Sequence, residues 1–213
     1  FTMVGFPQDV ADVYFGKQGI FQTLKPGATV IDMTTSKPSL AAKIGEYALA
    51  HGFHALDAPV SGGDIGAQNA TLTIMVGGVK ETFDRMLPLF KIIGKAATYF
   101  GPAGSGQHAK MANQIMIAGT MTGLTEMLLY TRAAGLNEQK VLTALSAGGA
   151  DNWSMENYVP RILKDAVSNT TLRAHETGRN LLCRPLLETK KSHTLLVAII
   201  MSLRYLTYQI TYS

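Results

Sequence analysis

The sequence of 213 residues predicts an α/β fold, in which a mostly parallel sheet is followed by an all-α part. In the first 100 residues, short apolar runs alternate with segments of helical periodicity, a pattern typical of strands connected by helices. Residues 106–134 contain no proline and are rich in Ala, Met, Leu and Ile. This stretch predicts one helix of about eight turns. Strands that alternate with helices form mostly parallel sheets, because each parallel connection needs a crossover.

The elements of the first 100 residues follow one another in regular alternation. The chain predicts five short strands, at residues 1–4, 28–32, 53–59, 71–76 and 97–100. It predicts three helices, at residues 9–16, 36–51 and 81–93. We expect Ser36 or Thr35 to cap the second helix, with Pro38 in its first turn.

The character of the chain changes after Gly101 and again near Asp165. Gly135 ends the long helix, and a further helix is predicted at residues 137–145. Few charges interrupt residues 111–129, so we expect this part to be buried on most sides, against a helical domain or a partner chain. We therefore divide the chain into residues 1–102, residues 103–165 and a tail of unlike composition, residues 166–213.

The composition excludes several classes of protein. With 46% hydrophobic and 16% charged residues the chain is of the folded, globular type. Its net charge of +4 comes from the tail, and the main body has no basic cluster with interleaved aromatics, so we predict no nucleic-acid partner. One cysteine suits a reducing compartment. Residues 1–10 do not resemble a secretory signal and the apolar run 195–203 is too short for a bilayer, so we expect a cytoplasmic protein with no membrane partner.

The first candidate motif is DAPVSGGDIGAQNATLTIMVGG, at residues 57–78. Ser61, Gly62 and Gly63 lie between two predicted strands, where glycines allow a ligand to approach the backbone N–H groups closely. An ordinary glycine-rich turn explains the same residues equally well.

The second candidate motif is GPAGSGQHAKMANQ, at residues 101–114. Lys110, Asn113 and Gln114 share one face of the predicted helix, because residues three and four apart are neighbours. One interpretation is a surface lysine whose stem lies along apolar residues. The other is an amine in a closed cleft, where burial lowers its pKa and a carboxamide orients a substrate. The histidines at positions 51, 54 and 108 have no metal-ligand pattern, so no metal is expected.

Together the two motifs resemble those of the β-hydroxyacid dehydrogenases, a family that includes enzymes similar to 3-hydroxyisobutyrate dehydrogenase, tartronate semialdehyde reductase and, more distantly, 6-phosphogluconate dehydrogenase. DAPVSGG with GA-x-x-x-TL-x-IMVGG is followed in register by G-x-GQ-x-x-K-x-x-NQ, and the resemblance covers residues 1–165. It implies an incomplete Rossmann-type sheet in residues 1–102, then an all-α substrate and dimerisation domain with a long interdomain helix. It also implies hydride transfer between NAD or NADP and a small β-hydroxyacid or its semialdehyde or keto form. The partners it implies are a substrate that carries a carboxylate and further copies of the chain, in a dimer or tetramer.

The same resemblance assigns roles to individual residues. Lys110 matches the catalytic lysine, which is the general acid in reduction and the base in the reverse direction. The residues that match substrate-binding positions are Ser61, Gly62, Gly63, Asn113 and Gln114. The residues that match cofactor-binding positions are Val4, Gly5, Asp9 and Thr35. Trp153 and Asn157 match a segment near the family's active site, although packing explains them equally well.

The chain departs from the family pattern at both ends. The family begins with a strand and a G-x-G-x-x-G turn, neither of which is present in this sequence, so the choice between NAD and NADP is open. Near the other end, Lys190 and Lys191 precede Ser192, where the family has a lysine–aspartate pair. A second hypothesis is therefore a catalytically inactive fragment that keeps only a helical association interface.

Overall fold

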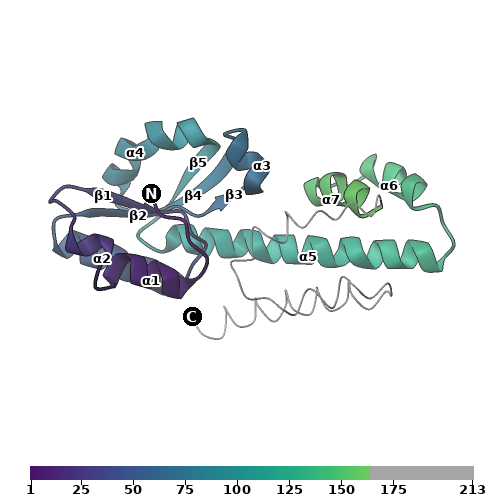
Figure 1. Cartoon of the computed structure of the whole chain (residues 1–213). Helices are drawn as coiled ribbons and strands as arrows, with labels where there is room; N and C mark the ends of the chain where they lie inside the picture. Colours follow the sequence, from purple (N-terminus) through teal and green to yellow (C-terminus); the bar gives the residue numbers. More distant parts are fainter. Residues whose placement is uncertain (164–213) are drawn as a thin grey trace. The chain divides into compact units, whose positions relative to one another are not determined.

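The computed structural model describes residues 1–163 (Figure 1). These residues form two compact units, Phe1–Asn113 and the described residues from Gln114 onward, which we describe separately. Helix α5 (Ser105–Ala133) begins in the first unit and continues in the second. The predictions for the tail at 166–213, including Lys190 and Lys191, lie outside the described residues.

The first unit contains a five-stranded mixed sheet. Its strands are β1 (Thr29–Asp32), β2 (His54–Asp57), β3 (Val60–Ser61), β4 (Leu72–Gly78) and β5 (Gly94–Gly101). β1 is parallel to β2 and β4 is parallel to β5, whereas β4 is antiparallel to both β2 and β3. The α/β class is confirmed, but the expectation of a mostly parallel sheet is wrong at the centre of this sheet.

The antiparallel pairing arises because β2 and β3 together fold back on β4 as a hairpin. Both pair with β4 in one continuous register, from Leu56 opposite Gly78 to Ser61 opposite Thr73. Between them the Pro59 carbonyl accepts a hydrogen bond from Met75, but Pro59 has no N–H to complete the pair. The connection contains the short helix α3 (Gly63–Gln68), so the stretch expected to be a glycine-rich loop is partly helical.

The strand predicted at residues 1–4 is reduced to a single bridge between Thr2 and Asp32. Thr2 donates to the Ile31 carbonyl at 2.9 Å and accepts from the Met33 N–H at 2.8 Å. Pairing stops there because the N–H of Val4 donates to a side chain, and α1 (Pro7–Phe15) begins three residues later.

Two further helices of this unit are α2 (Pro38–Ala50) and α4 (Lys80–Ile93), which match the predicted segments. The predicted cap of α2 is wrong, because the residue before its first turn is Lys37, which makes no side-chain cap. Ser36 is buried one residue earlier, and its N–H is held by the side chain of Gln107. The helix begins at Pro38, as predicted for a proline in the first turn.

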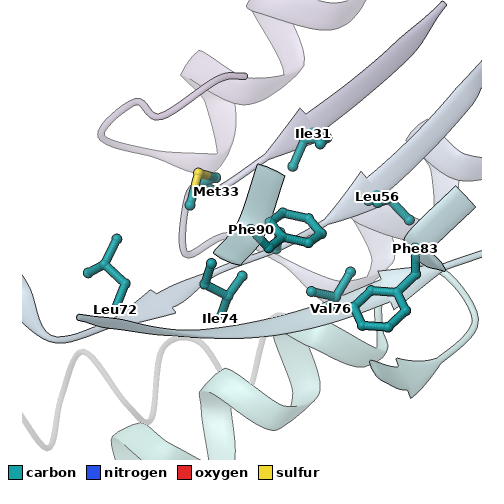
Figure 2. Close-up of a cluster of buried hydrophobic side chains, with 9 residues drawn as sticks. Ile31, Met33, Leu56, Leu72, Ile74, Val76, Phe83 and Phe90 are labelled. Atoms are coloured by element: carbon teal, nitrogen blue, oxygen red, sulfur yellow. The ribbon is translucent and has the colours of Figure 1, made fainter. Parts of the chain in front are cut away.

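Neighbouring residues of each strand belong to two separate hydrophobic cores, one on each face of the sheet, because strand side chains alternate between the two faces. Ile31 and Leu56 face α4, where Phe83 and Phe90 pack against Ile74 and Val76 (Figure 2). On the opposite face, Val30 and Ala55 pack against apolar residues of α1 and α2: Val10, Tyr14, Ile44 and Ala48. Helices thus cover both faces of the sheet (Figure 1).

The second unit is helical in the part that the structure describes. Leu124 and Leu128 of α5 pack with Leu142 of α6 (Glu138–Ser146) and with Met155 and Val159 of α7 (Trp153–Leu163). The long helix and the helix that follows it are confirmed. No helix among residues 1–163 is long and apolar enough to cross a membrane.

Part of α5 is exposed in the single chain, and its packing against a partner chain stays a prediction. Three consecutive residues, Ile115, Met116 and Ile117, are 49%, 70% and 38% exposed. Consecutive helix residues point in directions about 100° apart, so this exposure extends around the helix rather than along one edge. The core of the second unit forms only around the later turns, from Leu124 onward.

We expect Phe90→Ala to lower the free energy of unfolding by about 3–5 kcal/mol, because Phe90 is fully buried between α4 and the sheet. Ile92→Ala on the same helix is the control: Ile92 is 67% exposed, and its loss should change stability by less than about 0.5 kcal/mol. Urea unfolding of the two variants measures both values. Equal losses would mean that the two faces of α4 are assigned wrongly.

Candidate functional site

The candidate site lies where the carboxyl ends of β1 and β2 meet the start of α5. Ligands of open α/β sheets bind at the carboxyl ends of the strands. The segment Thr34–Ser36 follows β1, Asp57 ends β2, and both contact the first turn of α5.

Asp57 joins β2 to the beginning of α5. Its buried carboxylate accepts the N–H of Gly104 at 2.8 Å through one oxygen and the N–H of Gln107 at 2.9 Å through the other. Burial raises the pKa of the Asp57 carboxyl, and these backbone hydrogen bonds oppose the increase. A carboxylate satisfies N–H groups that a helix leaves unpaired at its N-terminus, and the helix dipole favours its charge. The first turn of α5 is therefore fixed to the end of β2.

Two glycines allow this close contact between helix and sheet. A Cβ atom on Gly106 would lie 2.4 Å from the carbonyl oxygen of Met75, and one on Gly77 would lie 2.5 Å from a carboxylate oxygen of Asp57. Neither position has room for a side chain. These glycines of the two motifs thus serve the packing of α5 on the sheet.

Gln107 connects α5 to the segment after β1. Its side chain is buried, the amide nitrogen donates to the Thr34 carbonyl at 2.7 Å, and the amide oxygen accepts the Ser36 N–H at 2.9 Å. Between them, Thr35 is exposed. The hydroxyl of Thr34 accepts the N–H of Val4 at 3.0 Å, so two predicted cofactor contacts, Val4 and Thr35, belong to neighbouring segments.

Lys110 follows Gln107 by three residues on α5. It is only 8% exposed, and burial lowers the pKa of its amine to about 8. The ion pairs among residues 1–163 do not include Lys110, so no carboxylate of this part opposes the effect of burial. The surface-lysine interpretation is therefore wrong. A buried amine with this pKa can hold or release a proton near neutral pH.

Asn113 and Gln114 follow Lys110 on α5, and both are partly buried. Asn113 is the last residue of the first compact unit, whereas Gln114 belongs to the second. Their substrate-orienting roles stay predictions.

The predicted carboxylate-binding residues lie at the beginning of α3. Ser61 ends β3 and is partly buried, whereas Gly62 and Gly63 are exposed. Gly62 and Gly63 have φ angles of 132° and 62°, a region that favours glycine. The role of these residues as a substrate site stays a prediction.

Asp9 has a structural role that the sequence did not predict. Its carboxylate accepts the N–H of Phe6 at 2.9 Å and so caps the first turn of α1. This negative charge disfavours a phosphate at that helix end. The cofactor-binding roles of Val4, Gly5, Asp9 and Thr35 stay predictions, and the capped end of α1 does not favour a pyrophosphate.

Asp57 and Gln107 are the site residues that sequence reasoning missed. Both belong to the quoted motifs, yet their residue types alone gave no sign of burial or of distant partners. The structure also describes residues that could bind a metal. His108 is exposed, and residues 1–163 contain no cluster of acidic, His or Cys residues that could hold a metal ion.

Two protein-family models match the chain. Residues 1–101 match the NAD binding domain of 6-phosphogluconate dehydrogenase, and residues 104–175 match a model described as NAD-binding of NADP-dependent 3-hydroxyisobutyrate dehydrogenase.

Individual proteins agree with these matches. An uncharacterized oxidoreductase of Bacillus subtilis, YkwC, is 56% identical over 76% of this chain and 57% of its own length. A probable 3-hydroxyisobutyrate dehydrogenase-like mitochondrial protein of Arabidopsis thaliana is 48% identical over 77% of this chain and 49% of its own length. The solved 3-hydroxyisobutyrate dehydrogenase of Mycobacterium tuberculosis with L-serine has a TM-score of 0.67 and 30% identity, over 75% of this chain and 54% of that one. The chain thus spans about half the length of the curated relatives it matches.

We expect Gly106→Ala and Gly119→Ala, both within α5, to have opposite effects on stability. A Cβ on Gly106 collides with backbone atoms, so the variant should lose about 1–3 kcal/mol or more. Gly119 has nothing within 4 Å of the added atom, so alanine should stabilise the helix by up to about 1 kcal/mol. Thermal unfolding of both variants gives the comparison, and a neutral Gly106→Ala would contradict the close approach.

We expect Lys110→Met to stabilise the fold at pH 7 by on the order of 1–3 kcal/mol. The folded-state pKa of Lys110, about 8, lies below its ordinary value of 10.5. Below pH 8 the amine is protonated in both states, so the folded state carries the full desolvation cost. Between pH 8 and 10.5 the unfolded chain binds more protons, so the stability of the parent rises with pH and the advantage of the variant shrinks.

Urea unfolding at pH 7 and at pH 9.5 measures this difference. Lys17→Met is the matched control, because Lys17 is exposed. An advantage of Lys110→Met that is the same at both pH values would show that Lys110 is not a buried amine.

Proposed function

The chain belongs to the β-hydroxyacid dehydrogenase family, and on this premise we propose that it is part of an NAD(P)-dependent oxidoreductase. The reaction is hydride transfer between NAD or NADP and a small β-hydroxyacid or its semialdehyde or keto form. The observation that carries the proposal is the buried Lys110, whose amine has a lowered pKa. It lies three residues after Gln107, which holds the backbone on both sides of Thr35.

In this proposal Lys110 moves the proton of the reaction. During reduction the ammonium donates a proton from Nζ to the carbonyl oxygen of the substrate, and during oxidation the neutral amine accepts the proton of the hydroxyl. The charged form also stabilises the negative charge that develops on the oxygen in a site that excludes water. A pKa near 8 supports both directions, since each form is accessible near neutral pH.

The cofactor contacts in this proposal are Val4, Gly5 and Thr35, with Asp9 nearby. A bound nicotinamide supplies or accepts the hydride. The hydrogen bond from Val4 to Thr34 supports a shared cofactor surface, because it ties the Val4–Gly5 segment to the residue before Thr35. The structural role of Asp9 as a helix cap makes it the weakest of these contacts.

The substrate class in this proposal is a small acid with a β-hydroxyl group. Ser61, Gly62 and Gly63 would hold its carboxylate through backbone N–H groups, and Asn113 and Gln114 would orient it. Support comes from the Mycobacterium tuberculosis relative, a 3-hydroxyisobutyrate dehydrogenase solved with L-serine, since 3-hydroxyisobutyrate and L-serine are both small β-hydroxyacids.

A second candidate function is association without catalysis. Met116, Gly119, Gly123 and Tyr130 are all exposed and follow one another three, four or seven residues apart on α5. Such spacing places them on one helix face, and glycines allow a second helix to approach closely. This observation favours a homo-oligomer, a dimer or tetramer, whether or not the chain is active.

We expect the chain and its Lys110→Met variant to bind NADH or NADPH with a dissociation constant below about 100 μM, roughly −5.5 kcal/mol. Turnover of L-serine or 3-hydroxyisobutyrate should fall about 10²–10⁴-fold in the variant, because only the proton transfer is lost. Fluorescence titration and initial rates measure the two effects, with Lys17→Met as control. If the chain binds neither cofactor but sediments as an oligomer, the association function holds and the oxidoreductase proposal fails for this chain.

A further inference from the structure

We propose that Gln107 is a positioning residue that fixes the segment of the cofactor contact Thr35 to the turn of α5 that carries Lys110. The inference rests on the proposed function, because it assigns the residue that brings these two groups into register. It concerns a side chain that touches neither substrate nor cofactor in the proposed reaction.

The carboxamide of Gln107 fits the polar backbone groups on both sides of Thr35. One side of a carboxamide donates and the other accepts, and here it donates to the Thr34 carbonyl at 2.7 Å and accepts from the Ser36 N–H at 2.9 Å. The two bonds hold the polar groups immediately before and after Thr35 against the interior. Thr35 is therefore presented outward, where the structure has it exposed.

The backbone of Gln107 is itself held in place. Its N–H donates to the buried carboxylate of Asp57 at 2.9 Å, so the residue cannot move with a loosened helix end. Lys110 lies three residues further along α5, a rise of about 4.5 Å. One side chain thus fixes the Thr35 segment to the same helical turn that carries the amine.

The side chains of Thr35 and Ser36 themselves do not hold this conformation. The hydroxyl of Ser36 is buried and has no hydrogen-bond partner in the described part of the chain, which is unfavourable by about 1–3 kcal/mol. The side chain of Thr35 is exposed, so it does not anchor the segment in the interior. The segment is held through its backbone: Asp32 accepts the Thr34 N–H at 3.1 Å, and Gln107 supplies the bonds to the Thr34 carbonyl and the Ser36 N–H.

The test uses the full chain without cofactor and three variants. Gln107→Met fills the space but removes both hydrogen bonds. Gln107→Glu keeps the length, but when ionised it places a carboxylate oxygen against the Thr34 carbonyl. When protonated it again has one donor and one acceptor, like the original carboxamide. Gln22→Glu, at an exposed position, is the control.

We expect Gln107→Met to speed amide hydrogen exchange of Ser36 about tenfold, measured by NMR, because the variant removes the side-chain oxygen that accepts the Ser36 N–H. Gln107→Glu should show the faster Ser36 exchange at neutral pH and lose this effect as pH is lowered through the titration of the introduced carboxyl group. Recovery at acid pH identifies the donor, because a merely structural loss of packing does not reverse on protonation. Unchanged Ser36 exchange in Gln107→Met, or Ser36 exchange in Gln107→Glu that does not recover at acid pH, would overturn the proposal.

A double-mutant cycle then separates this inference from the proposed function. Gln107→Met should weaken NADPH binding about tenfold, and in a Thr35→Ala background it should have little further effect. Additive losses would overturn the coupling to cofactor binding. If the parent chain binds no cofactor while the NMR effects appear as expected, the oxidoreductase proposal fails for this chain and the positioning role of Gln107 stands.

Discussion

The candidate site depends on the buried carboxylate of Asp57. This residue ends β2, and its two oxygens accept backbone N–H groups from the start of α5. A buried carboxylate is unfavourable unless it is hydrogen-bonded, and the unpaired N–H groups of a helix end supply such bonds. Gly77 and Gly106 let the backbones approach closely enough for this contact. The same bonds that satisfy the carboxylate therefore fix the first turn of α5 to the end of β2.

Burial has opposite electrostatic consequences for the two ionisable groups near this contact. It raises the pKa of Asp57 and lowers the pKa of Lys110, because in each case the charged form is disfavoured. Asp57 receives backbone hydrogen bonds that favour its charged form, so it is suited to a fixed structural role. No ion pair within residues 1–163 does the same for Lys110, so its amine is suited to exchange a proton.

The arrangement of the strands explains how residues far apart in sequence reach one site. The hairpin of β2–β3 with β4 makes the sheet mixed, yet β1 and β2 remain parallel and end side by side. Their carboxyl ends therefore present Thr34 and Asp57 to the same helical turn, where Gln107 contacts both. The placement agrees with the general location of ligand sites in α/β folds.

The sequence by itself determined the α/β class, most elements, the long helix and the two motifs, because apolar periodicity and glycine positions are local properties of the chain. It also indicated Lys110 as a candidate site residue, because a lysine within an apolar helical segment can be recognised from the sequence alone. Only the tertiary structure decided that the sheet is mixed, that Ser36 does not cap α2 and that Asp57 and Gln107 are part of the site. The hydrogen-bond partners of Gln107 lie 50, 71 and 73 residues away in sequence. Burial, and with it the pKa of Lys110, depends on such distant residues, which no local pattern specifies.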